Sequence, residues 1–103
     1  MKFLTKQNLA NLPPLYANDG KPAEEVPAPV KFFTPWSSWT WYATEYDPAE
    51  GRFFGLVVSN LCPEGELGYF MREELENFDG PWGLHIERDR HWRGTLADAK
   101  AAR

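Results

Sequence analysis

The chain has 103 residues, of which 43% are hydrophobic and 16% aromatic, and its formal net charge is −4. This composition excludes an intrinsically disordered chain and predicts a single domain over residues 1–103 with one core. The negative charge excludes a general basic surface for nucleic acid. One cysteine, Cys62, excludes an intramolecular disulfide and fits a reducing cytoplasm. The sequence has no signal-peptide pattern and no apolar run near the ~18 residues of a membrane span, so we expect no membrane partner.

The N-terminal third is predicted to hold one short helix and a long loop. Thr5 is a suitable N-cap, and leucines follow at helical spacing, so we expect a helix over residues 6–12 that ends before two prolines. An Asn-Asp-Gly turn comes next. Residues 21–29 carry three prolines and are predicted to form an extended loop rather than a linker between domains.

The middle of the chain is predicted to form an antiparallel meander. Segments rich in β-favouring residues are separated by turn-forming residues at 30–34, 39–46, 53–59 and 66–70. Alternation along the second segment puts Trp39, Trp41, Ala43 and Glu45 on one face, which we expect to face the core. The third segment is apolar on both faces, and this predicts an interior strand.

Helical and edge-strand patterns follow toward the C-terminus. We expect a helix over residues 72–78, a short edge strand within 84–89 and a final helix capped by Thr95, with Asp98 completing a capping box. The tail over 98–103 is expected to fray. The order of elements is typical of an α+β fold: a small antiparallel β-meander of three to five strands, with short helices packed on one face.

One segment, residues 87–91, concentrates five ionisable side chains. In an extended chain Glu87, Asp89 and His91 would share one face. These donors suit a divalent ion, and they are the candidates for a metal-dependent hydrolase or nuclease. Extended spacing spreads them over about 13 Å, however, which is too wide for one ion.

An ion-pair network is the favoured interpretation of the same segment. We expect a structural cluster of Glu87, Arg88, Asp89 and His91 that fixes the strand end. The two carboxylates would pair with nearby guanidinium groups, drawn from Arg72, Arg88, Arg90 and Arg93. Three of these arginines, Arg88, Arg90 and Arg93, form the only dense basic group in the chain, so they are also candidate binding residues.

Aromatic residues form a second cluster, made of Trp36, Trp39, Trp41, Tyr42 and Tyr46. A role in the core explains most of them. Exposed members around Trp36 and Tyr42 are candidate binding residues, since Trp and Tyr are favoured in protein interfaces. Aromatic side chains on a sheet can also stack nucleic-acid bases, although such sites need lysine or arginine beside them.

Catalytic signatures are missing from the sequence. It has no Gly-x-Ser-x-Gly nucleophile turn and no glycine-rich phosphate loop. A single cysteine cannot supply the common structural zinc patterns. We therefore assign no catalytic residue and no cofactor.

Six short motifs in fixed order resemble one family. They are Phe33-Thr-Pro, Thr40-Trp-Tyr-Ala-Thr-Glu-Tyr-Asp47, Phe54-Gly-Leu56, Glu66-Leu-Gly-Tyr-Phe70, Glu74-Leu75 and Ile86-Glu-Arg-Asp-Arg-His-Trp92. Together they cover about residues 5–93 and resemble the bacterial domain of unknown function family 2958. One departure is Met71, where such sequences often place a Ser or Thr helix cap. The resemblance implies a bacterial protein carried on plasmids, integrative elements or phages, and it transfers no catalytic residue.

These observations favour a small cytoplasmic binding or accessory protein of a mobile element, without enzymatic activity, that recognises a protein partner. A nucleic-acid-binding module and a metal-dependent hydrolase or nuclease are the alternatives. The sequence leaves the oligomeric state and the identity of the partner open.

Overall fold

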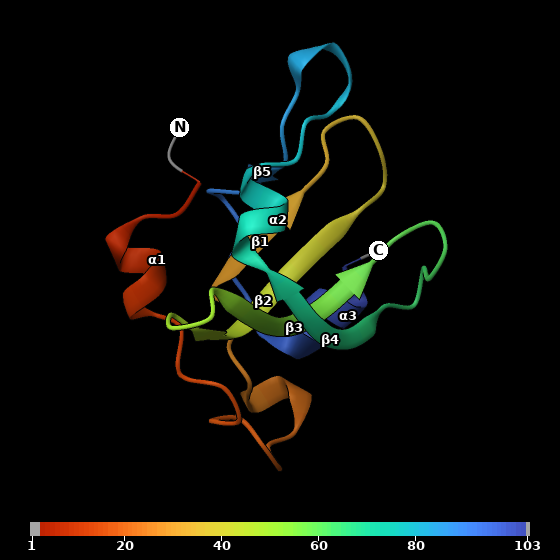
Figure 1. Ribbon diagram of the computed structural model, residues 1–103. Coiled ribbons are helices and arrows are strands. Elements are labelled where there is room, and N and C mark those ends of the chain that lie inside the picture. The colour runs from red at the N-terminus through yellow and green to blue at the C-terminus, as the bar shows by residue number, and fades with distance from the viewer. Residues whose placement is uncertain (1–2, 103) are drawn as a thin grey trace.

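The computed structural model describes residues 3–102, so the two ends of the expected domain, residues 1–2 and 103, lie outside it. Five strands form one antiparallel sheet in the order β4-β3-β2-β1-β5 (Figure 1). Their bounds are β1 Val30–Phe33, β2 Thr40–Asp47, β3 Arg52–Val58, β4 Glu66–Met71 and β5 Glu87–Arg88. The α-helices are α1 Lys6–Ala10, α2 Arg72–Glu76 and α3 Leu96–Ala101, and the 3₁₀ helices are η1 Ala23–Glu25 and η2 Pro81–Gly83.

The first four strands form the predicted meander, because each is joined to the next by a short turn and pairs with it antiparallel. The expected α+β class is confirmed. The third strand is interior, as its two apolar faces predict. The predicted edge strand is also present as β5, but it is only two residues long and pairs with β1.

Two hydrophobic clusters cover the two faces of the sheet. The first contains Phe32 and Phe53, both fully buried, and receives side chains from the α1 and α2 regions. The second contains Tyr42 and Leu56 and receives side chains from η1 and α3. Each fully buried large apolar side chain contributes roughly 1.5–3 kcal/mol. The expectation that the helices cover one face is therefore wrong: the central strands are apolar on both faces, and each face needs a cover.

A register shift interrupts β2. Ala43 pairs with Gly55, and Glu45 pairs with Phe54, so Thr44 is the extra residue of a bulge. The Thr44 hydroxyl donates a hydrogen bond to the Phe54 carbonyl oxygen at 3.0 Å. Because a bulge reverses the alternation beyond it, Tyr46 rather than Glu45 joins the cluster that contains Ala43. The expectation that Glu45 shares the core face of Trp41 is wrong for this reason.

Helix caps follow the sequence closely at both ends of the chain. The Thr5 hydroxyl accepts the Asn8 amide, and the Thr95 hydroxyl accepts the Asp98 amide, each within a reciprocal capping box. The helix α2 begins after Met71, which offers no side-chain cap, and it ends at Glu76, two residues before the predicted end. The helix α1 likewise ends at Ala10, two residues early.

Candidate functional site: an aromatic groove

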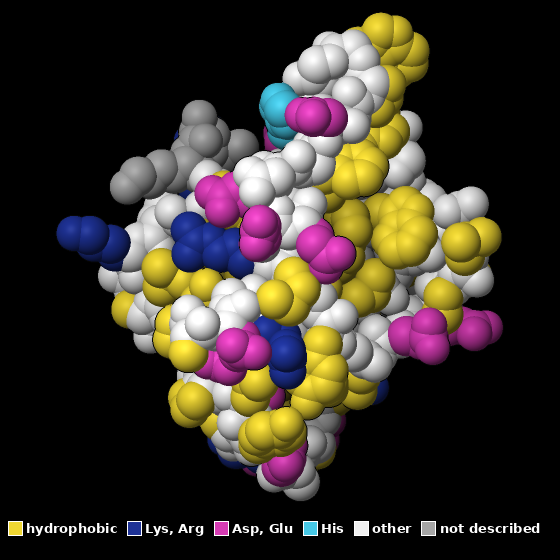
Figure 2. Space-filling view, in the orientation of Figure 1, with side chains coloured by type: hydrophobic (Ala, Val, Ile, Leu, Met, Phe, Trp, Pro, Cys, Tyr) yellow, Lys and Arg dark blue, Asp and Glu magenta, His cyan; other side chains and the backbone are white. Residues whose placement is uncertain are grey.

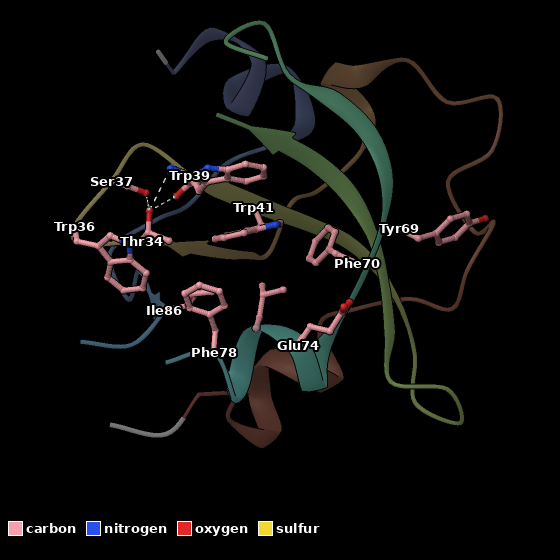
Figure 3. Close-up of a pocket in the computed structure, with 11 residues that line it drawn as sticks. Thr34, Trp36, Ser37, Trp39, Trp41, Tyr69, Phe70, Glu74, Phe78 and Ile86 are labelled. Carbon is pink, nitrogen blue, oxygen red and sulfur yellow. Dashed lines mark hydrogen bonds between the residues drawn. The ribbon is translucent and has the colours of Figure 1, made fainter. Parts of the chain in front are cut away.

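A groove of about 520 Å³ opens between the first face of the sheet and the α2 region. Hydrophobic side chains gather around this hollow, and acidic side chains stand beside it (Figure 2). Most of its lining is aromatic or aliphatic (Figure 3). The lining residues are Thr34, Trp36, Ser37, Trp39, Trp41, Tyr69, Phe70, Glu74, Leu75, Phe78 and Ile86.

The turn between β1 and β2 sets one wall of this aromatic groove. The buried Thr34 hydroxyl lies 2.6 Å from the Ser37 hydroxyl and accepts the Trp39 amide at 3.2 Å. The Thr34 amide in turn donates to the Trp39 carbonyl oxygen at 3.0 Å. These bonds fix the conformation of the turn that carries Trp36.

Trp36 stacks on Phe78, with ring centroids 5.9 Å apart and an interplanar angle of 10°. This contact requires a close approach to Gly80, where an added Cβ would lie 2.5 Å from the Trp36 ring. The Gly80 amide donates to the Leu84 carbonyl oxygen, which closes the loop after α2. A glycine at this position therefore permits the loop to pack against the groove wall.

Trp39 and Trp41 form the opposite part of the lining, stacked at 5.8 Å. Phe70 and Leu75, which belong to the core, complete the floor. Glu74 is the one charged lining residue among those described. An apolar hollow with a few polar groups at its border is suited to a large apolar side chain.

Tyr42 does not belong to this groove. Its exposed fraction is 2%, and its ring lies edge-on to Trp92 at 5.0 Å in the second hydrophobic cluster. Lys31 Nζ lies 5.5 Å from each of these two ring centroids. The expectation that Tyr42 is exposed is wrong, because β2 is covered on both faces. Trp36 does line the groove.

The charged segment does not keep an extended conformation to residue 91. The strand ends at Arg88, and the Asp89 amide donates to the Lys31 carbonyl oxygen at 2.8 Å. The Asp89 carboxylate then accepts the His91 amide at 2.9 Å, which forms a local turn. The predicted shared face of Glu87, Asp89 and His91 is therefore absent.

The predicted ion-pair cluster has a different composition in the structure. Asp89 pairs with Lys31 at 3.6 Å rather than with an arginine, and Arg72 pairs with Glu76 at 3.4 Å. Arg88 donates from Nε to the Phe3 carbonyl oxygen at 3.1 Å and so ties the N-terminal segment to β5. Within residues 3–102, Glu87 forms no ion pair.

The basic candidates lie apart from the aromatic groove. Arg88 and Arg90 line a separate depression of about 520 Å³ that shares no residue with the groove, and its other lining residues are Phe33, Glu87, Asp89 and His91. Arg90 and Arg93 are exposed. In the described part of the chain, no three His, Cys, Asp or Glu residues are arranged to hold a metal ion.

The two carboxylates of this segment should therefore behave differently on substitution. We expect Asp89→Ala to lower the free energy of unfolding by about 1 kcal/mol, because it removes a turn-forming hydrogen bond and a partly exposed ion pair. Glu87→Ala should change it by less than about 0.5 kcal/mol. Urea denaturation of both variants measures the difference. Equal losses would contradict the assignment of Asp89 as the structural member.

Several groove residues were not identified from the sequence. Phe78, Ile86 and Glu74 reach the groove from segments far from the tryptophans, through contacts between β1–β2 and the α2 loop. The available signal was local: Phe78 precedes Asp-Gly-Pro, where a chain turn leaves a large apolar residue near the surface. Its exposed fraction is 49%.

The fold and the groove define a small α+β domain with an aromatic groove on one face of its sheet. The sequence matches the family described as Protein of unknown function (DUF2958) over residues 3–100, so the chain belongs to this family and the resemblance is confirmed. No curated protein and no solved structure gives a significant match. Among the described helices, none has the length and apolarity needed to cross a membrane.

Proposed function

We propose that this protein is a non-enzymatic recognition protein that holds an apolar segment of a partner protein in the aromatic groove. The observation that carries the proposal is the lining: three tryptophans and Phe78 surround a hollow large enough for a large side chain. Burial of apolar surface against rigid aromatic rings is the usual source of affinity at protein interfaces. The stacked pairs hold these rings in position before a ligand arrives.

The groove also indicates the charge of its ligand. Glu74 is the charged residue of the described lining, and its carboxylate would favour a lysine or arginine beside the apolar anchor. The same carboxylate would oppose a phosphate group. Because the arginine depression is separate from the groove, these features support a peptide ligand over a nucleic acid.

The cellular setting belongs to the proposal as well. The family resemblance supports a cytoplasmic accessory protein of a bacterial plasmid, integrative element or phage. Its partner would then be a protein of the element or of the host cell.

Selection from a random peptide library displayed on phage tests the proposal. We expect enriched peptides to carry a large apolar residue next to lysine or arginine. Trp39→Ala should lower the affinity for a selected synthetic peptide by about 30-fold or more, which corresponds to a loss of about 2 kcal/mol in binding free energy. Isothermal titration calorimetry measures the affinity, and circular dichroism verifies that the variant is folded.

A second tryptophan supplies the matched control. Trp82 is 89% exposed and does not line the groove, so Trp82→Ala should leave the affinity unchanged. Equal weakening by both variants, or no enriched peptide, would contradict a peptide-binding groove. Micromolar binding of single-stranded DNA or RNA in a gel shift, abolished by Trp39→Ala, would favour the nucleic-acid alternative.

A further inference from the structure

The outer edge of β4 is open for pairing. The Arg72 amide donates to the Gly51 carbonyl oxygen across β3 and β4 at 2.8 Å, and this bond sets the phase of the ladder. In an antiparallel pair, residues alternate between those bonded to the neighbour and those facing away. The even-numbered residues of β4 are thus directed to β3. The N–H groups of Leu67, Tyr69 and Met71 and the carbonyl groups of Leu67 and Tyr69 are directed to the edge, where β4 is the terminal strand of the sheet. Met71 is the N-cap of α2, so its carbonyl oxygen accepts the first hydrogen bond of that helix.

This edge lacks the usual protection against pairing. An exposed edge strand normally carries proline, lysine or a bulge, or is kept very short. β4 has six residues with a continuous register to β3, it contains neither lysine nor proline, and its one charged residue, Glu66, stands at its first position. Leu67 and Tyr69 are 49% and 50% exposed. The opposite edge, β5, is only two residues long.

We propose that β4 pairs antiparallel with β4 of a second copy of this chain, about a two-fold axis at Tyr69, and joins the two sheets into one. Such a symmetric interface must be self-complementary. The axis places Leu67 opposite Met71 of the second copy, so apolar side chains meet on one face of the sheet. It places Glu66 opposite Arg72 of the second copy on the other face, where the Arg72 guanidinium also contacts Glu76 and the Tyr46 hydroxyl of its own chain.

Gly68 supports this register. Its φ is not in the left-handed region, and an added Cβ would meet no atom within 4 Å, so the isolated fold does not require a glycine there. Across the two-fold axis Gly68 faces Phe70 of the second copy. A missing side chain at this position lets a bulky aromatic neighbour approach across the new strand pair.

Sedimentation velocity tests the dimer. The edge is short, so the interface is small and we expect reversible association. The mean sedimentation coefficient should therefore rise with protein concentration over about a hundredfold range. Leu67→Pro removes an outward N–H that the fold of one copy does not use, and proline is tolerated at such edge positions. It should weaken association by about tenfold or more. Leu67→Val keeps the N–H and should preserve association. A monomer at every concentration, or a dimer that persists in Leu67→Pro, would overturn the proposal.

A crosslink tests the register itself. In a Cys62→Ser background, Tyr69→Cys would place two thiols on opposite strands at a hydrogen-bonded pair, about 5.5 Å apart at Cα, within the range of a disulfide. Mild oxidation should yield a covalent dimer. Glu24→Cys, an exposed position on η1, should not crosslink above the level of chance collisions. Equal crosslinking at both positions would overturn the Tyr69 axis. Leu67 does not line the aromatic groove, so the sedimentation result is separate from peptide binding. Tyr69 does line the groove, so Tyr69→Cys reports only on the register of the two strands.

Discussion

Replacing Gly55 with alanine is expected to prevent stable folding. An added Cβ would overlap the Tyr42 carbonyl oxygen and lie 2.9 Å from the Tyr42 carbonyl carbon. Both atoms belong to the backbone of β2, so no side-chain rotation can relieve the overlap. β2 and β3 would have to separate at the centre of the sheet, beside the bulge. We expect the free energy of unfolding to fall by about 4 kcal/mol or more, which is at the upper end of the range for single substitutions.

Its cross-strand partner supplies the control for that substitution. Gly68 pairs with Gly55, yet an alanine Cβ at Gly68 would touch nothing within 4 Å. Gly68→Ala should therefore be neutral or raise the free energy of unfolding by about 0.4–1 kcal/mol, because alanine reduces the conformational entropy of the unfolded chain. Urea denaturation followed by circular dichroism compares the two. A folded Gly55→Ala of nearly normal stability would show that β2 and β3 are not in such close contact.

The elements that depend on local signals were predictable from the sequence. The turn residues between the β-favouring segments gave the meander, and the residue types around Thr5 and Thr95 gave both capping boxes. Each of these features needs only a few consecutive residues, because a cap or a tight turn satisfies its own backbone groups locally. The ends of α1 and α2 were predicted two residues too late, because a helix this short is marginal by itself and its tertiary contacts decide where it ends.

The bulge in β2 was not predictable for a physical reason. Most residues from Thr40 to Tyr46 favour an extended strand, and the segment has no glycine or proline, so the pattern contains no local mark of an inserted residue. The position of the bulge depends on the partner strand, where Gly55 admits a close approach of β2. The prediction assigned Glu45 and Tyr46 to the wrong faces of the sheet because it did not include Thr44 as an extra residue.

The two candidate sites show the same limit. The alternation of donors over residues 87–91 predicts a shared face, but alternation places side chains on one face only while the strand continues. Asp89 ends the strand by accepting an amide of its own turn. Only part of the aromatic groove was predictable from the sequence. Trp36 and Trp39 are close in sequence, whereas Phe78, which stacks on Trp36, belongs to a distant loop. Sequence periodicity does not report such long-range contacts.

Because of the bulge at Thr44, the side chain of Glu45 lies on the opposite face of the sheet from the one predicted. Replacing Glu45 is expected to detach the loop over residues 15–20 from the sheet. Its exposed fraction is 4%, and its two carboxylate oxygens accept the amides of Tyr16 and Asn18 at 2.8 and 3.0 Å. Tyr16 has a φ of 72°, a left-handed conformation that is unfavourable for a bulky residue and needs support from its surroundings. Its hydroxyl also accepts a hydrogen bond from Tyr69, which raises the pKa of the Tyr69 phenol.

We expect Glu45→Ala to lower the free energy of unfolding by about 3 kcal/mol, because two amides lose a charged acceptor inside the fold. Glu45→Gln retains one acceptor oxygen and should lower the free energy of unfolding by less than Glu45→Ala does. Glu50→Ala is the matched control, since Glu50 is exposed and pairs only loosely with Arg52 at 3.7 Å; it should be nearly neutral. Hydrogen exchange should locate the effect, with the amides of Tyr16 and Asn18 exchanging faster than those of the central strands. Equal stability of the Glu45 and Glu50 alanine variants would mean that the loop is held by other contacts, because a buried carboxylate that truly binds two amides cannot be removed without cost.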